Sequence, residues 1–138
     1  MTREQWAKLT DDEKRIKVAE LCGWKRDKSR VNTFGEHPWN HPDQKEPPLS
    51  CYTAWAELDL PDYLNDLNAM HEAVMSVDLF WFKLNYTSCL MRIIQDDSDT
   101  DFFGDQDRRF THAAQFEIYN ATAAQRAEAF VLTMEEGS

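Results

Sequence analysis

The sequence has few of the features that mark a membrane, secreted or disulfide-linked protein. No apolar run approaches the ~20 residues that a transmembrane helix needs, and the first residues lack the apolar stretch of a signal peptide. The chain of 138 residues has only three cysteines, Cys22, Cys51 and Cys89, and none belongs to a CxxC pair. We therefore expect a protein of the cytoplasm with reduced thiols and no membrane partner.

Motifs of the common enzyme classes are also missing. The sequence has no GxSxG, no HExxH and no glycine-rich phosphate loop. Cys51, Cys89 or Ser88 could pair with His71 or His112 as nucleophile and base. His71, however, falls on the apolar stripe of a predicted helix, where a half-buried, hydrogen-bonded histidine is expected. The sequence thus predicts a protein without enzymatic activity, catalytic residues or cofactor.

One set of residues resembles zinc ligands without completing a site. His37 and His41 are four residues apart, but Pro38 disfavours the helix that would bring them together. Cys51 and Glu36 are the nearest further ligands, and zinc normally requires four. We predict no metal, although zinc binding by these side chains stays open.

A second set resembles the start of a calcium loop. Asp97, Asp99 and Asp101 match the first three oxygen positions of an EF-hand. The required glycine is replaced by Phe102, and the bidentate glutamate of the twelfth position is replaced by Arg108. The sequence excludes a true EF-hand and leaves open a weak, irregular cation site.

Charge gives the clearest limit on partners. Asp and Glu total 25 against 15 Lys and Arg, so the formal net charge is −10. Such a surface repels phosphate, which argues against general affinity for DNA, RNA or anionic membranes. The acidity fits plain solubility, a binder of basic proteins, or a mimic of nucleic acid.

Capping signals and apolar spacing place helices along the chain. Thr10 followed by Glu13 predicts a helix over 11–22 that stops at Gly23, and Thr122 with Gln125 predicts a last helix whose apolar side includes Ala124, Ala127 and Phe130. A short helical turn is expected within 1–9. A helix should begin at 60–62, and another over 79–94 with Asp78 as its cap, although LFWFKLNY also fits a strand. The stripe of the helix from residue 60 would comprise Leu60, Leu64, Leu67, His71 and Val74.

The remaining segments suggest a small sheet and two long loops. Alternation in HAAQFEIY predicts a strand over 112–119, and a partner strand should lie near 50–56 because a lone strand leaves its backbone unpaired. Prolines interrupt 25–50, where we expect an irregular loop pinned by Phe34, Trp39 and Trp55. A second, acidic loop covers 96–109. We predict one α+β domain over 1–138, with a small antiparallel sheet packed between helices.

Three blocks carry a resemblance to a known family. The stretches DEKRIKVAELCGWK, LPDYLNDLNAMHEA and ATAAQRAEAF, in this order, resemble the phage ABA sandwich domain family. These are small proteins of bacteriophages and prophages, mostly of unknown function. The resemblance implies a sheet between helical layers and supplies no catalytic residues.

The basic run after residue 24 suggests a ligand site. An arginine beside an aromatic ring can hold a base or a nucleotide, and a solvated loop is the plainer interpretation. Such a protein would act as a sponge that sequesters a nucleotide immune signal. The ligand-binding residues would be Lys25, Arg26, Arg30, Trp39, Arg108 and Arg109, beside Lys28 and Phe34.

The acidic segment carries the leading functional hypothesis. Acids would steer an encounter with a basic groove and a phenylalanine pair would supply buried area, although the pair could also anchor the loop to the core. We expect a phage accessory protein that inhibits a host defence complex, anti-CRISPR-like, by mimicking nucleic-acid charge, without binding nucleic acid itself. A housekeeping or structural phage component and a homo-oligomer stay open. The partner-binding residues would be Asp96, Asp97, Asp99, Asp101, Phe102, Phe103, Asp105 and Asp107.

Overall fold

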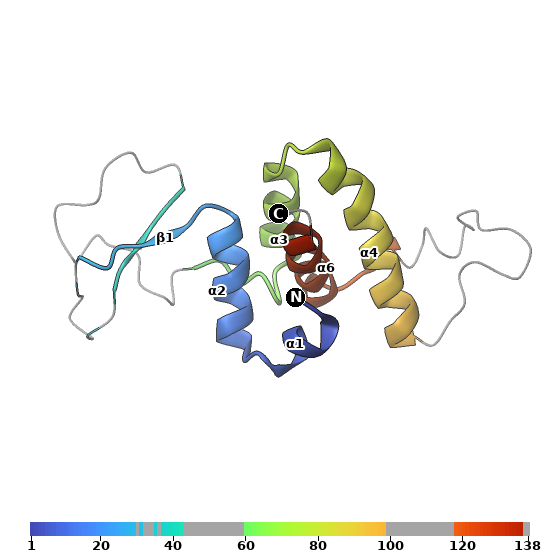
Figure 1. Ribbon diagram of the computed structural model, residues 1–138, viewed down its shortest axis with the longest axis horizontal. Coiled ribbons are helices and arrows are strands. Elements are labelled where there is room, and N and C mark those ends of the chain that lie inside the picture. The colour runs from blue at the N-terminus through green and yellow to red at the C-terminus, as the bar shows by residue number, and fades with distance from the viewer. Residues whose placement is uncertain (30, 32–34, 36, 43–59, 99–117, 137–138) are drawn as a thin grey trace, which may run out of the picture.

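A computed structural model describes residues 1–29, 31, 35, 37–42, 60–98 and 118–136. Two short strands, β1 (Lys25–Arg26) and β2 (Trp39–Asn40), pair antiparallel, with Arg26 opposite Trp39. The predicted α+β class with a small antiparallel sheet is confirmed (Figure 1). The helices of the described residues are α1 (Arg3–Lys8), α2 (Asp11–Leu21), α3 (Leu67–Ser76), α4 (Phe80–Ser98) and α6 (Ala123–Glu136).

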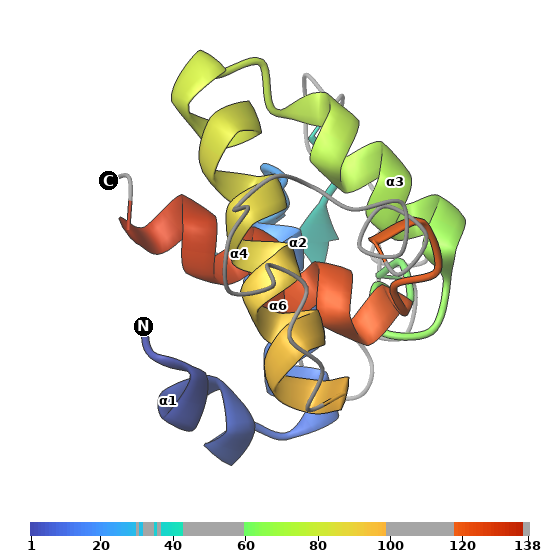
Figure 2. The same ribbon diagram turned by 90° about the vertical axis from the view of Figure 1, so that its right-hand side faces the viewer.

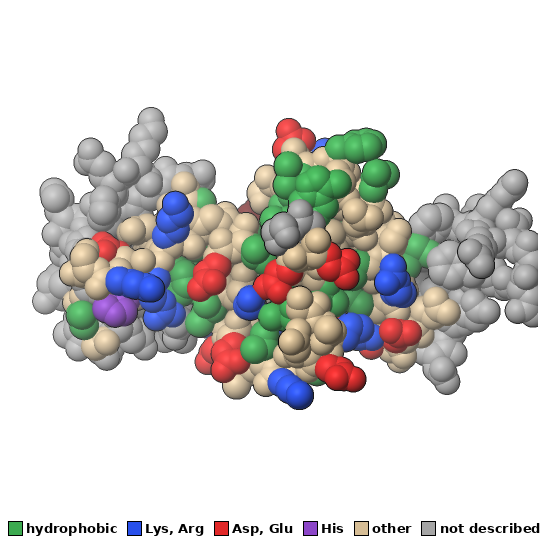
Figure 3. Space-filling model, in the orientation of Figure 1, with side chains coloured by type: hydrophobic (Ala, Val, Ile, Leu, Met, Phe, Trp, Pro, Cys, Tyr) green, Lys and Arg blue, Asp and Glu red, His purple; other side chains and the backbone are tan. Residues whose placement is uncertain are grey.

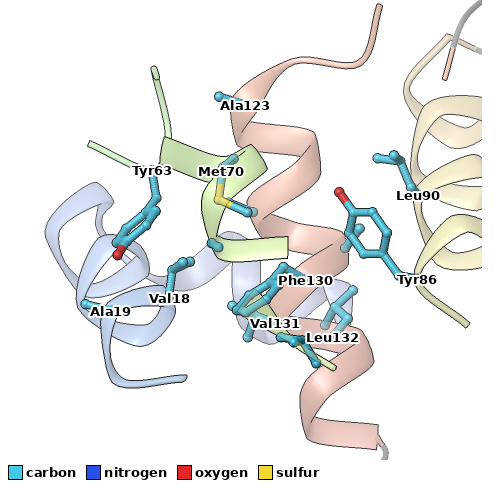
Figure 4. Packing of buried hydrophobic residues seen from close by; sticks show 14 of the residues in the cluster. Val18, Ala19, Tyr63, Met70, Tyr86, Leu90, Ala123, Phe130, Val131 and Leu132 are labelled. Atoms are coloured by element: carbon cyan, nitrogen blue, oxygen red, sulfur yellow. The ribbon is translucent and has the colours of Figure 1, made fainter. Parts of the chain in front are cut away.

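Helix α6 forms the centre of the molecule. It packs against α1, α2, α3 and most extensively α4, which crosses it in Figure 2. Residues 127–133 are all buried, and Figure 4 shows side chains of the neighbouring helices directed toward them. The sheet lies beside α2 (Figure 1). The middle layer between the other helices is therefore formed by α6 and not by the sheet, because strands of two residues are too short to form a layer.

The capping signals at residues 10 and 122 are confirmed. The Thr10 hydroxyl accepts from the Glu13 backbone N–H at 3.2 Å. Thr122 and Gln125 form the reciprocal pair of a capping box. The Gln125 backbone N–H donates to the Thr122 hydroxyl at 3.1 Å, and the Thr122 backbone N–H donates to the Gln125 side-chain oxygen at 3.0 Å. Gly23 follows α2 at φ +98°, a left-handed conformation that favours glycine. A separate first helix, α1, also occurs where a short helical turn was expected.

The prediction of a helix beginning at 60–62 is wrong, and its apolar stripe is confirmed only in part, because Leu60 is buried and Leu64 and Val74 pack against the core. Residues 60–66 are not helical and include a turn at 63–65, and Asp66 caps α3 by accepting from the Asn68 N–H at 2.9 Å. The later start changes the face that meets the core, because Met70 and Ala73 are buried while Leu67 is 52% exposed. His71 is exposed as well, not half-buried as expected.

The predicted helix for the segment LFWFKLNY, which also fitted a strand, is confirmed, because Phe80 begins α4. Phe82, Tyr86 and Leu90 share one buried face at a spacing of four residues. Asp78 is not its cap; the Leu79 carbonyl accepts the first hydrogen bonds, and the Asp78 carboxylate accepts from Lys83 at 3.4 Å. The helix extends to Ser98, beyond the predicted end.

The predicted sheet lies largely outside the described residues. This holds for all of 50–56 and for 112–117. Ile118 and Tyr119, the end of the predicted strand, are helical. In α6, Ala124 is exposed rather than on the apolar side. Within the predicted loop 25–50, β1 and β2 add regular structure, Trp39 is fully buried as expected of a pin, and Phe34 and Trp55 lie outside the described residues.

Candidate functional site

The acidic segment begins on an ordered helix end. Asp96 and Asp97 occupy the last turn of α4, so their prediction as loop residues is wrong. The other six predicted contact residues lie outside the described part of the chain. Carboxylates are unfavourable at a helix C-terminus, where the macrodipole is negative, and a compensating cation is therefore expected nearby.

Arg3 of α1 supplies that cation. Its guanidinium donates to Glu128 of α6 at 2.6 Å (Nε) and 3.2 Å (Nη2), to Asp96 at 3.2 Å and to Asp97 at 3.0 Å. Gln125 donates a further hydrogen bond to Asp97 at 3.0 Å. Helices α1, α4 and α6 are thus joined by one charged network. Its carboxylates, Glu128 above all, raise the pKa of Arg3, which stays charged.

The network leaves this end of α4 negative. One guanidinium faces three carboxylates, and α4 has no basic residue in its last turn. The Asp96 side chain is 60% exposed, so it keeps oxygen atoms open to solvent. A hollow of about 470 Å³ adjoins the network, with Trp6 and Lys14 among its lining residues. We call Asp96, Asp97, Glu128 and Arg3 the acidic end.

No local pattern in the sequence predicts this network. Arg3 and Asp96 are 93 positions apart, and Arg3 and Glu128 are 125 apart. The pairing depends on how α1 packs onto α6, which apolar spacing within either helix does not specify.

The structure brings together three of the predicted ligand-binding residues, but not as an open site. Lys25 and Arg26 on β1 lie beside Trp39 on β2, with the Arg26 guanidinium 4.6 Å from the centre of the Trp39 ring. The Trp39 side chain has no exposed surface, so it is a core residue rather than a platform for a base. Arg30, Arg108 and Arg109 lie outside the described residues.

A pocket of about 250 Å³ collects several polar side chains between α2, β2 and α3. Its lining includes Cys22, His41, Tyr63, Glu72 and Ser76. His41 packs edge-on against Trp24 at 4.8 Å between ring centres. Burial raises the pKa of the Cys22 thiol to about 11, opposed in part by its hydrogen bond with Tyr63. The thiol is protonated at neutral pH, which is unfavourable for a nucleophile.

This pKa predicts slow thiol chemistry. In a variant with Cys51→Ser and Cys89→Ser, we expect Cys22 to react with an aromatic disulfide reagent at pH ~8 on the order of 100-fold more slowly in the folded than in the unfolded chain, because the thiolate fraction falls tenfold per pKa unit. Absorbance of the released thiol measures both rates. Equal rates would contradict the burial of this thiol.

The other predicted nucleophiles and metal ligands do not assemble in the described residues. Burial raises the pKa of Cys89 also, and His71 lies exposed on α3. His112, Cys51 and Glu36 are outside the described residues. Within the ranges that the structure describes, no three His, Cys, Asp or Glu side chains are grouped as metal ligands.

Comparisons with known proteins leave the family open. Neither a scan against protein-family models nor searches of curated proteins and solved structures found a match to this chain. The resemblance to the phage ABA sandwich domain family therefore stays a prediction. Of the helices described above, none has the length and apolar character needed to cross a membrane.

Proposed function

We propose that this chain is a non-enzymatic binding protein that docks on a basic surface of a partner protein through the acidic segment 96–109, which begins at the acidic end. The observation that carries the proposal is the charge imbalance at the C-terminus of α4, where Arg3 faces Asp96, Asp97 and Glu128. Four more aspartates follow within ten residues of Asp97, so the ordered carboxylates are the start of a longer acidic segment. Opposite charge steers such an encounter and increases its rate.

The class of partner comes from the resemblance to phage proteins. We propose a host antiviral defence complex, inhibited in the bacterial cytoplasm in an anti-CRISPR-like manner. A complex that holds nucleic acid presents a basic surface suited to phosphates, and a chain with net charge −10 is complementary to it. The proposed contact is with the protein, not with nucleic acid.

Affinity capture from a bacterial lysate, with bound proteins identified by mass spectrometry, tests this proposal. We expect wild type to retain a nucleic-acid-binding protein that a quadruple variant loses. The variant carries Asp99→Asn, Asp101→Asn, Asp105→Asn and Asp107→Asn, which leaves the Arg3 network intact.

A matched control removes the same amount of charge elsewhere. Glu13, Glu20, Glu72 and Glu136 are exposed on three other helices and are changed together to Gln. We expect this control variant still to retain the partner protein. If both quadruple variants lose the captured protein equally, net charge alone explains the binding. If both retain it equally, docking through the acidic segment is rejected.

A further inference from the structure

The pocket of about 250 Å³ between α2, β2 and α3 plays no part in the function proposed above. Part of its wall consists of small apolar side chains, namely Pro42, Pro61, Ala69 and Ala73. Ligand pockets combine such apolar walls with a few polar groups that fix the orientation of the ligand. This pocket is smaller than the ~300–1,000 Å³ that drug-sized molecules occupy, so it suits a short aliphatic ligand.

The lining of this pocket contains a carboxylate without a basic neighbour. Glu72 lies on α3 at the solvent-exposed side of the pocket. Among the lining residues that the structure describes there is no Lys or Arg, so Glu72 forms no ion pair within the pocket. Burial raises the pKa of Cys22 and of Tyr63, so the thiol and the phenol stay neutral near pH 7 and leave this negative charge in place.

Two helices end at the pocket and add to its negative character. Cys22 is the C-cap of α2, and Ala73 and Ser76 belong to the last turn of α3. A helix C-terminus carries a partial negative charge, and neither helix has a basic residue in its last turn. The helix dipoles and the Glu72 carboxylate therefore have the same sign, and the pocket favours a cation.

The basic residues that follow α2 in the sequence do not neutralise the pocket. Neither Lys25 nor Arg26 lines it, and the Arg26 guanidinium lies 4.6 Å from the centre of the Trp39 ring instead. Figure 3 shows Lys and Arg side chains gathered over the sheet, at the left of the molecule. The net charge of −10 also attracts cations to the protein as a whole.

The lining suits an organic cation better than a metal ion. Within the described ranges no three His, Cys, Asp or Glu side chains are grouped as metal ligands, so a metal ion would lack its ligand set there. Tyr63 supplies an aromatic ring to the lining, and Figure 4 shows this side chain directed toward α2. An ammonium group is attracted by aromatic rings as well as by carboxylates, and the apolar wall accommodates an alkyl chain.

We propose that this pocket binds a small alkylammonium ion, with the ammonium group at Glu72 and the alkyl chain against Pro61 and Ala69. The site does not depend on the proposed function, because it shares no residue with the acidic end. A ligand of few atoms gains limited affinity, so we expect weak, reversible binding in the millimolar range.

Two-dimensional amide NMR spectra recorded during a titration with n-butylammonium chloride test the site. We expect saturable shifts of the backbone amides of Cys22, Ala69 and Ala73. The neutral analogue n-butanol should bind at least about tenfold more weakly, because it lacks the charge that pairs with Glu72. Sodium chloride at the same ionic strength should not reproduce the shifts.

Three variants locate the binding within the pocket. Glu72→Gln should weaken the binding of n-butylammonium at least about tenfold, and Ala69→Leu should abolish it by filling the pocket without a change of charge. Glu13→Gln is the matched control, because it removes the same charge from an exposed position in the first turn of α2, and it should leave the affinity unchanged.

Circular dichroism checks that each variant keeps its helices. Three results would each overturn the proposal: no saturable shifts in wild type, equal affinity for n-butylammonium and n-butanol, or an affinity that Glu72→Gln leaves unchanged.

Discussion

Replacement of Phe130 by alanine is expected to lower the free energy of unfolding by about 4 kcal/mol. Phe130 has no exposed surface and lies on α6, the helix that α1, α2, α3 and α4 all contact. Its ring meets the Phe82 ring of α4 edge-to-face, with 5.6 Å between the ring centres. Truncation removes this contact and leaves a cavity that a rigid, surrounded helix cannot close. Urea unfolding followed by circular dichroism measures the change.

Phe80→Ala is the matched control for this prediction. It removes the same atoms from a side chain that is 78% exposed, so the free energy of unfolding of the monomer should change by less than about 0.5 kcal/mol. Because both substitutions are Phe→Ala, a difference between their unfolding free energies reports burial and not residue type. Similar losses at positions 80 and 130 would contradict the placement of α6 at the centre.

Replacement of Arg3 by methionine is expected to cost about 1–2 kcal/mol of unfolding free energy. The guanidinium is partly exposed, which limits the stability that its ion pairs contribute. Its removal, however, leaves the Glu128 carboxylate, which is 10% exposed, without a hydrogen-bond donor from α1. Lys8→Met removes the same charge from the exposed side of the same helix and should change stability little.

A double-mutant cycle separates the contact from the general loss of charge. If Glu128 is left unpaired by Arg3→Met, then Glu128→Gln should recover part of the loss in that background, since a neutral amide is less costly to bury unpaired than a carboxylate. Additive effects of the two substitutions would show that Arg3 and Glu128 do not interact.

Local signals predicted much of the helical framework. The hydroxyls of Thr10 and Thr122 accept backbone N–H groups as expected from their sequence neighbours, because a cap depends only on residues within one turn. Gly23 ends α2 for the same local reason. The start of α3 was missed because Asp66 and Pro61 are both plausible start signals, and only Asp66 caps the helix.

Sites built across long distances in the sequence were not predictable in this way. Asp96 and Asp97 read as loop residues because acids oppose a helix C-terminus, and the compensating Arg3 comes from the other end of the chain. Trp39 was predicted both as an anchor of its loop and as a ligand-binding residue, and the sequence could not decide between them, because burial of the ring depends on long-range packing and not on spacing.

The dependence of partner binding on ionic strength tests the central claim, docking through the acidic segment, most directly. Between about 0.01 M and about 0.1 M salt the Debye length falls from about 30 Å to about 10 Å. The affinity of wild type for the captured protein should therefore fall at least about tenfold. The quadruple Asp→Asn variant should show a markedly smaller decrease. An affinity independent of salt, or an equal decrease for wild type and the variant, would contradict the account.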